Sequence, residues 1–316
     1  RTMLNLDTED WNELFIGCAG GAGWKLSNSF DVYAGRIAYT WKLSISGLAG
    51  GHSGIQIHEQ LGNAIKLACQ FLLSIEDVRL AEFQAGVAHN VIPREAVAVF
   101  STSQSSPEHL QKLLEDLQRG WQTYLPAADQ ALNCTLVRTE SKPEIDQEDS
   151  TKLLNLMAIF PHGAIAYSNS GQKKLVDLSV NLAIARLERG EFFLEASYRF
   201  FNESQTFPLQ QTISAISEAF NINCQLENGY PGWKPDHESS LLAKGVDLHR
   251  RLFDFEPEIK AIHAGLECGI LKGKMPEVDM LSFGPTIKGA HSPQERLDIA
   301  TVEPFWRYLT TFVKEL

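Results

Sequence analysis

The sequence predicts an α/β domain that is interrupted by an inserted α+β domain. Strand-like segments followed by helices occur at both ends of the chain, which is typical of one α/β domain. Between them, residues 36–228 hold two successive sets of strands and helices. NGYPGWKPDHESS, residues 228–240, is rich in Gly and Pro, as a domain boundary usually is. We therefore expect residues 1–24 and 231–316 to form one domain and residues 25–230 to form the insertion.

Short strands and helices make up the interrupted domain. TMLNL is apolar and strand-like and is followed by Asp7, and ELFIGC is a second short strand that runs into glycines. After the insertion come a helix over residues 238–253, the segment EIKAIHAGLECGIL, the buried strand DMLSFGPTI and a terminal helix over residues 298–315. Gly265 and Gly269 favour a loop in the second of these segments.

The insertion begins with the half-buried strand RIAYTWKLSISGL. The apolar residues of the next segment, residues 56–75, recur at helical spacing and predict a helix. Two strands then turn near the proline of HNVIPREA, and a helix follows with Ser106 as its N-cap. After the strand ALNCTLVRT and the helix DQEDSTKLLNLMAIF, the order recurs with strands over 174–186 and 191–201, a helix over 208–220 and the strand INCQLENG.

The composition excludes several classes of protein. The 316 residues carry a formal net charge of −11, which argues against a general nucleic-acid-binding surface. The five cysteines are scattered without a C-x-x-C pair, so we expect neither a disulfide framework nor a zinc ribbon. A reducing, cytoplasmic setting fits this usage, and no apolar run is long enough to span a bilayer.

Two histidines and one aspartate stand at positions suited to a functional site. His52, in GLAGGHSGIQIH, and His291, in GPTIKGAHSPQER, both lie on turns of small residues that leave room for a ligand. Asp7 ends an apolar strand, where α/β sheets place functional groups. Taken singly, Asp7 is better explained as a solvated turn carboxylate and His291 as a surface histidine on a loop.

Four further residues are candidates for substrate binding. Arg199 interrupts the aromatic strand EASYRFF, where its guanidinium can hold a carboxylate or extend to solvent. Asn90, at a strand end, offers both hydrogen-bond donors and acceptors. His263 and Glu267 are four residues apart around a glycine, and this spacing alone is a weak metal-binding signal.

Taken together, these segments resemble the aminoacyl-histidine dipeptidases, which belong to a family of two-zinc dipeptidases, carboxypeptidases and deacetylases. The segments that carry the resemblance are NLDTED, IGCAGG, SGLAGGHSGIQIHEQLGNAIKLACQFL, HNVIPREA, AIHAGLECGIL and GPTIKGAHSPQER. The resemblance runs in register over essentially the whole chain. It implies a zinc-peptidase catalytic domain of α/β type that is interrupted by an α+β lid domain, which also forms the dimer.

The resemblance implies a role for each candidate. Asp7 and His291 correspond to ligands of the two zinc ions, for which Co2+ or Mn2+ are implied substitutes. His52 corresponds to a lid histidine that reaches the partner subunit's site in family dimers and stabilises the oxyanion. Asn90 and Arg199 correspond to residues that hold the substrate, with Arg199 on its C-terminal carboxylate.

The match also implies that His263 and Glu267 lie on a loop of the substrate site. The family's other zinc ligands and its glutamate general base precede the segment that matches residue 1, and neither an H-x-D motif nor a Glu-Glu pair occurs here. We therefore expect the chain to be the later part of a longer protein and to be inactive without the missing groups.

Three functions remain open at this point. The first is hydrolysis of Xaa-His dipeptides by a zinc-activated water in a cytoplasmic homodimer that forms through the lid. The second is a related N-acyl amino acid amidohydrolase or deacetylase, although GGHSGIQIH and HAGLECG favour the dipeptidase branch. The third is an inactive dimerisation fragment. No nucleic-acid or membrane partner is expected.

Overall fold

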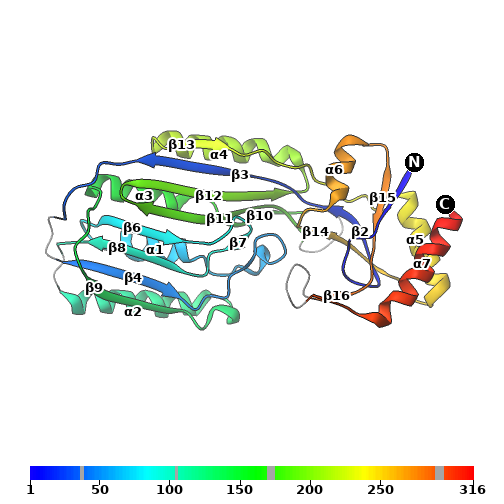
Figure 1. Ribbon diagram of the computed structural model, residues 1–316, viewed down its shortest axis with the longest axis horizontal. Helices are drawn as coiled ribbons and strands as arrows, with labels where there is room; N and C mark the ends of the chain where they lie inside the picture. The colour runs from blue at the N-terminus through cyan, green and yellow to red at the C-terminus, as the bar shows by residue number, and fades with distance from the viewer. Residues whose placement is uncertain (36–38, 104–105, 169–174, 289–294) are drawn as a thin grey trace. The chain divides into compact units, whose positions relative to one another are not determined.

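The structure is a computed structural model that describes residues 1–35, 39–103, 106–168, 175–288 and 295–316 (Figure 1). The chain divides into two compact units. Unit 1 consists of Arg1–Gly21, Phe200–Glu203 and Tyr230–Leu316, and unit 2 of Ala22–Arg199 and Ser204–Gly229. Among the described residues, no helix combines the length and the apolar character needed to cross a lipid bilayer.

Unit 1 is built on a mixed four-stranded sheet in the order β1-β15-β2-β14. β1 runs parallel to β15, β15 antiparallel to β2, and β2 parallel to β14. The carboxyl ends of β1 and β15 therefore lie at one edge of the sheet, and those of β2 and β14 at the other. The strands are β1 (Thr2–Asn5), β2 (Glu13–Cys18), β14 (Glu258–Ile262) and β15 (Asp279–Ser282).

Helices α5 (Ser240–Phe253) and α7 (Val302–Glu315) cover the core of unit 1. Leu14, Leu281 and Tyr308 belong to one buried cluster with residues of both helices. At the start of α5 the Ser239 hydroxyl accepts the N–H of Leu242 at 3.0 Å, and Oδ2 of Asp279 accepts that of Leu241 at 3.0 Å. Strand β15 thereby fixes the first turn of α5. A short hairpin pairs β16 (Ile287–Lys288) with β17 (Arg296–Leu297).

The loop expected around Gly265 and Gly269 is partly wrong, because α6 (Glu267–Lys274) is a helix that contains Gly269. This glycine is buried, and a Cβ built on it would lie 2.5 Å from the carbonyl oxygen of Pro231. Glycine at this position allows α6 to approach the backbone of Pro231 closely, and it does not end the helix.

Unit 2 contains, within the described residues, a nine-stranded sheet whose main order is β13-β3-β12-β11-β6-β8-β4-β9. In that order, the strands are β13 (Asn223–Leu226), β3 (Gly20–Ser29), β12 (Glu191–Phe200), β11 (Val176–Glu188), β6 (Arg79–Ala85), β8 (Ala96–Ser101), β4 (Thr40–Ser46) and β9 (Asn133–Thr139). The ninth strand, β10 (Gly163–Tyr167), pairs with β11. The short strands β5 (Gly51–His52) and β7 (Val91–Ile92) pair with each other.

The sheet of unit 2 repeats one pattern on both sides of the β6–β11 pair. Outward from this pair, the order is β6-β8-β4-β9 on one side and β11-β12-β3-β13 on the other. We call these halves, with their helices, the first copy and the second copy. The first copy carries α1 (Ala64–Leu73) and α2 (Pro107–Tyr124), and the second α3 (Gln147–Ile159) and α4 (Thr206–Ala219). The copies join where β6 pairs antiparallel with β11 and where α1 packs against α3 (Figure 1).

Two sets of strands and helices are thus present, but one strand comes from an unexpected place. Strand β3 belongs to the second copy although it precedes the first copy in the sequence. Its glycines suggested the end of a short strand. A Cβ built on Gly23 would lie 2.7 Å from the carbonyl oxygen of Ala196 in β12, so glycine permits close packing of two long strands.

The helix expected over residues 56–75 begins later than the spacing suggests. Ile57–Glu59 form a single 3-10 turn, and α1 starts after Asn63, whose side chain accepts the N–H of Ile65 at 3.0 Å. Ile57 is nonetheless buried, which explains why the apolar spacing looked continuous. The fourth helix, α4, begins at Thr206, two residues before the predicted start.

Two histidines make the fold sensitive to acid. Nδ1 of His162 accepts the N–H of Leu182 at 3.3 Å, and burial followed by the charge of Lys66 lowers its pKa to about 3. Burial also lowers the pKa of His249, whose ring is surrounded by Trp11, Phe253, Phe255 and Tyr308. Both rings are therefore neutral in the folded protein at neutral pH.

The thermal midpoint is expected to fall as the pH drops below about 6.5, the usual pKa of histidine in an unfolded chain. A histidine whose pKa is lowered by folding stabilises the protein fully above the pKa of the unfolded chain. Below that pH the unfolded chain binds a proton more tightly than the folded protein does, so the stabilisation is lost as the pH falls toward the pKa of the folded protein. Replacing His162 with Asn should flatten this fall between pH 6.5 and pH 4, as measured by calorimetry. The same replacement at exposed His109 should leave it unchanged, and an unaltered slope in His162→Asn would contradict the assignment.

Candidate functional site

A cavity in the first copy of unit 2 brings two of the candidate residues together. It has a volume of about 380 Å³, and His52 and Asn90 both line it. Val87, Val91 and Ile92 give it an apolar wall. A cavity of this size with a few polar groups on an apolar wall is suited to a small ligand.

Backbone hydrogen bonds join the segments that carry His52 and Asn90. His52 pairs with Val91 in the β5–β7 ladder, and the N–H of Ser53 donates to the carbonyl of Asn90 at 2.9 Å. The turn packs closely at Gly51, where a built Cβ would lie 3.0 Å from Oε1 of Gln56 and 2.9 Å from Cδ1 of Leu61. The glycines before His52 thus allow the turn to pack closely on its neighbours.

The second copy supplies Arg199 to the same region. Burial and then the positive charge of Arg199 lower the pKa of His52. Ser197, two residues earlier on β12, donates its hydroxyl to the carbonyl of His89 at 2.9 Å. Because residues two apart on a strand share one face, this face of β12 borders the segment that carries Asn90.

Asn181 is a second link from the second copy. Its side chain, which is 2% exposed, donates from Nδ2 to the carbonyls of His89 at 3.1 Å and of Val91 at 3.0 Å. These two carbonyls flank Asn90, so Asn181 on β11 fixes the backbone on both sides of it. His52, Asn90 and Arg199 are therefore arranged by contacts between the two copies within one chain.

The three side chains offer complementary groups to a ligand. At neutral pH His52 is a neutral imidazole, Arg199 a guanidinium and Asn90 an amide. A guanidinium binds a carboxylate by a planar pair of hydrogen bonds, and an imidazole N–H can donate to a carbonyl oxygen. The arrangement can hold an anionic end group and polarise a nearby carbonyl.

The remaining candidates lie in unit 1. Asp7 is exposed and follows β1, and its backbone N–H donates to Oδ1 of Asn5 at 3.2 Å. Because β1 and β15 are parallel neighbours, Asp7 and the segment after β15 leave the same edge of the sheet. His291 follows that segment but lies outside the described residues.

His263 and Glu267 follow β14, whose carboxyl end is at the other edge of the sheet. His263 is 6% exposed, and its ring lies 5.6 Å from that of Phe201. Glu267 is exposed at the start of α6. Burial raises the pKa of the Cys268 thiol to about 12, with smaller contributions from the thiol of Cys18 and the carboxylates of Glu267 and Asp7. Both carboxylates therefore act on the same thiol in unit 1.

The residues described so far do not build a metal centre. Within the described parts of the chain, no group of three or more His, Cys, Asp or Glu side chains is placed to hold a metal ion. Of the two implied ligands, the structure describes Asp7 and does not describe His291.

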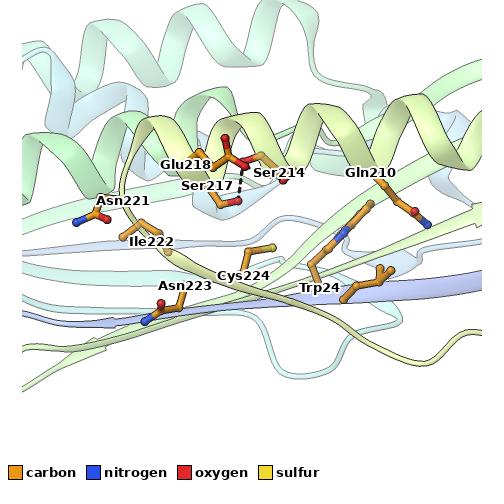
Figure 2. Close-up of a pocket in the computed structure, with 10 residues that line it drawn as sticks. Trp24, Gln210, Ser214, Ser217, Glu218, Asn221, Ile222, Asn223 and Cys224 are labelled. Atoms are coloured by element: carbon orange, nitrogen blue, oxygen red, sulfur yellow. Dashed lines mark hydrogen bonds between the residues drawn. The ribbon is translucent and has the colours of Figure 1, made fainter.

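A second cavity, of about 500 Å³, lies between α4 and β13 and is not a catalytic candidate (Figure 2). None of the candidate residues lines it. Several of its polar groups are hydrogen-bonded within the protein: Gln210 donates to the Tyr198 hydroxyl at 2.8 Å, and the Ser214 hydroxyl to Glu218 at 3.2 Å. These hydrogen bonds tie α4 to itself and to β12.

Three residues that hold the segments of His52 and Asn90 are not evident from the sequence, namely Gln56, Asn181 and Ser197. Asn181 left a signal, because it is a lone amide in the otherwise apolar segment SVNLAIA of a predicted strand. A polar side chain at a buried strand position needs a partner, and that need indicates a positioning role. Ser197 left no comparable signal, since it alternates like any half-buried strand residue.

Comparisons with known proteins agree with this architecture. The family described as the peptidase dimerisation domain matches residues 43–127, which lie in the first copy. The cytosol non-specific dipeptidase of Escherichia coli (strain K12) is 32% identical over 99% of this chain and 66% of its own length. The crystal structure of aminoacylhistidine dipeptidase from Vibrio alginolyticus matches with a TM-score of 0.91 and 30% identity, over 100% of this chain and 65% of that one.

The chain thus spans about two thirds of the length of both relatives. Over that span the likeness extends to the whole of both units, since nearly every residue of the chain is aligned. The matched dimerisation domain, the sequence identity and the shared fold agree: the chain belongs to the M20 peptidase family.

Proposed function

We propose that the protein hydrolyses dipeptides, with a preference for Xaa-His dipeptides. The observation that carries this proposal is the grouping of His52, Asn90 and Arg199 by the two copies of unit 2. The names of both relatives, a non-specific dipeptidase and an aminoacylhistidine dipeptidase, support it. Arg199 and Asn90 hold the C-terminal carboxylate of the substrate, and His52 donates a hydrogen bond to the oxygen of the scissile carbonyl as charge develops on it.

The test is a substrate panel. The full-length protein in its metal-loaded form is assayed with Ala-His, with Ala-Ala and with N-acetyl-histidine. The proposal expects both dipeptides to be cleaved, Ala-His faster than Ala-Ala, and N-acetyl-histidine slowly or not at all. Faster release of acetate than of alanine would instead establish an N-acyl amino acid amidohydrolase.

The proposal extends to a metal centre with two zinc ions in each site and a glutamate general base. The residues present do not by themselves fit such a centre, because the described side chains include no group of three ligands. The topology of unit 1 supports Asp7 and His291 as contributors, since the segments that carry them leave one edge of the sheet.

Replacing Asp7 with Ala in the full-length protein is expected to weaken the binding of Zn2+, because a carboxylate ligand is lost. Equilibrium dialysis with Zn2+ alone measures this without any assay of activity. Replacing Asp10, an exposed carboxylate three residues later, provides the matched control and should change zinc binding little. Equal zinc affinity in Asp7→Ala and wild type would remove Asp7 from the ligand set.

Replacing Asn181 with Ala is expected to lower kcat/KM for Ala-His at least about tenfold, because the carbonyls on both sides of Asn90 lose the amide that holds them together. Asn63→Ala is the control. Asn63 is also buried and also donates to a carbonyl, that of Leu182 on β11 at 2.9 Å, but this carbonyl does not adjoin Asn90. Both variants should have a lower thermal midpoint than the wild type. At a temperature where both are fully folded, only Asn181→Ala should have a lower kcat/KM. Parallel losses in the two variants would mean that Asn181 is purely structural.

We also propose a cytoplasmic homodimer that forms through unit 2. The match of residues 43–127 to the peptidase dimerisation domain supports it. Light scattering coupled to size-exclusion chromatography should give twice the chain mass for the wild-type protein. The mass of one chain at micromolar concentration would contradict the proposal.

A further inference from the structure

The turn from His52 to Gln56 is closed by hydrogen bonds in both directions. The backbone N–H of His52 donates to Oε1 of Gln56 at 3.0 Å, and the backbone N–H of Gln56 donates to the carbonyl of His52 at 3.0 Å. Within this ring, Nδ1 of His52 accepts the N–H of Gly54 at 3.2 Å and that of Ile55 at 3.1 Å. The imidazole is thus held by its own turn.

These bonds decide where the imidazole carries its proton. A neutral imidazole has one nitrogen that donates and one that accepts. Because Nδ1 faces two backbone N–H groups, it must be the acceptor, and the proton must be on Nε2. We infer that Gln56 is a positioning residue, and that the turn it closes holds His52 as the neutral Nε2–H tautomer, a hydrogen-bond donor rather than a base.

The surroundings of His52 act in the same direction. A second proton on the ring would have to bind Nδ1. There it would replace the acceptor of the Gly54 and Ile55 N–H groups with a donor that repels them. The other charged groups near the ring are Arg199 on β12 and the exposed pair Arg94 and Glu95, which line the cavity. Burial and the charge of Arg199 lower the pKa of His52, so the neutral form persists below the usual pKa of histidine.

This inference deepens the proposed function and rests on it only for its consequence. A histidine that accepts at Nδ1 and donates at Nε2 can stabilise an oxyanion without a change in its own protonation. It cannot remove a proton from water through Nε2. The role of His52 in hydrolysis is therefore confined to donation, and the strength of that donation depends on Gln56.

The experiment is 15N NMR of the histidine rings in the whole chain, labelled at its nine histidines, with the His52 signals assigned through His52→Ala. In the wild type at pH 7.5, His52 is expected to show a protonated Nε2 and an unprotonated Nδ1.

Gln56→Leu should let Nδ1 gain a proton in part of the molecules, and should raise the pKa of His52 toward its usual range. Gln56→Glu keeps the acceptor for the N–H of His52, so it should keep the Nε2–H tautomer while its negative charge raises the pKa. Gln111→Leu, which removes an exposed bond from Gln111 to Glu115 on α2, is the matched control and should change neither.

A protonated Nδ1 in the wild type, or the same tautomer population in Gln56→Leu and wild type, would overturn the inference. If Gln56→Leu does not fold, Gln56→Ala, which also removes the acceptor for the N–H of His52, takes its place. The kinetic expectation is a fall of about five- to tenfold in kcat for Gln56→Leu, with KM nearly unchanged. The NMR readout needs no substrate, so a protein that cleaves no dipeptide would defeat the proposed function and leave the tautomer result intact.

Discussion

Replacing His52 with Ala is expected to lower kcat for Ala-His by about a hundred- to a thousandfold. One hydrogen-bond donor to a developing oxyanion contributes about 3–4 kcal/mol in a site where water is excluded. KM should change much less, because this bond strengthens in the transition state rather than in the bound substrate. Zinc binding should remain as in the wild type, since His52 belongs to unit 2 and Asp7 to unit 1.

The control for this variant is His58→Ala. His58 is exposed on the 3-10 turn that follows the His52 turn, and it does not line the cavity. Its loss should leave kcat within about twofold of wild type, as is usual for surface substitutions. A large rise in KM with unchanged kcat in His52→Ala would contradict a role in the transition state.

Replacing Arg199 with Lys is expected to lower kcat/KM for Ala-His about a hundredfold and to lower that for its C-terminal amide much less. Lysine keeps the charge, but a single ammonium cannot reproduce the planar pair of hydrogen bonds that a guanidinium makes with a carboxylate. The amide lacks the carboxylate, so it loses little when the guanidinium is removed. Steady-state kinetics on the two substrates measure the difference.

Arg186→Lys is the matched control, because Arg186 is exposed on β11 in the same copy. It should affect both substrates equally and weakly. Equal, large losses on the dipeptide and its amide in Arg199→Lys would show that Arg199 supports the structure and does not bind the substrate carboxylate.

Most regular elements of this fold could be predicted from sequence because their local signals agree with their packing. Ser106, for example, accepts the N–H of His109 at 3.3 Å and begins α2 at Pro107, as its position before a proline suggests. The failures share one cause. Gly23, Gly51 and Gly269 all stand where another part of the chain approaches closely, and a single sequence does not reveal such an approach. Local rules therefore took two of these glycines for breaks in regular structure.

The candidate site was predictable in part, for a related reason. The side chains of His52, Asn90 and Arg199 can bind or polarise a ligand, so their residue types and neighbours are enough to make them candidates. Their grouping depends on the pairing of β6 with β11, which joins residues about 100 positions apart, and no local pattern encodes that pairing. The partners that hold them, Asn181 and Gln56, act through ordinary amide hydrogen bonds and are visible once the fold is known.

The two copies in unit 2 also change what a dimer must provide. The resemblance to family dimers implies a lid histidine that works in the partner subunit's site. Here the charge of Arg199, from the second copy, already acts on His52, from the first copy, within one chain. We therefore propose that one chain supplies both residues to one substrate.

The most direct test of this claim is the activity of mixed dimers, made by co-expressing His52→Ala and Arg199→Ala chains with different affinity tags and purifying on both tags. If one chain supplies both residues, each site in a mixed dimer lacks one of them, and activity on Ala-His should stay at the level of the single variants. If the two residues came from different chains, one site of each mixed dimer would be intact. Activity would then recover to about half of wild type in the purified mixed dimers, given independent sites, and that recovery would contradict the account.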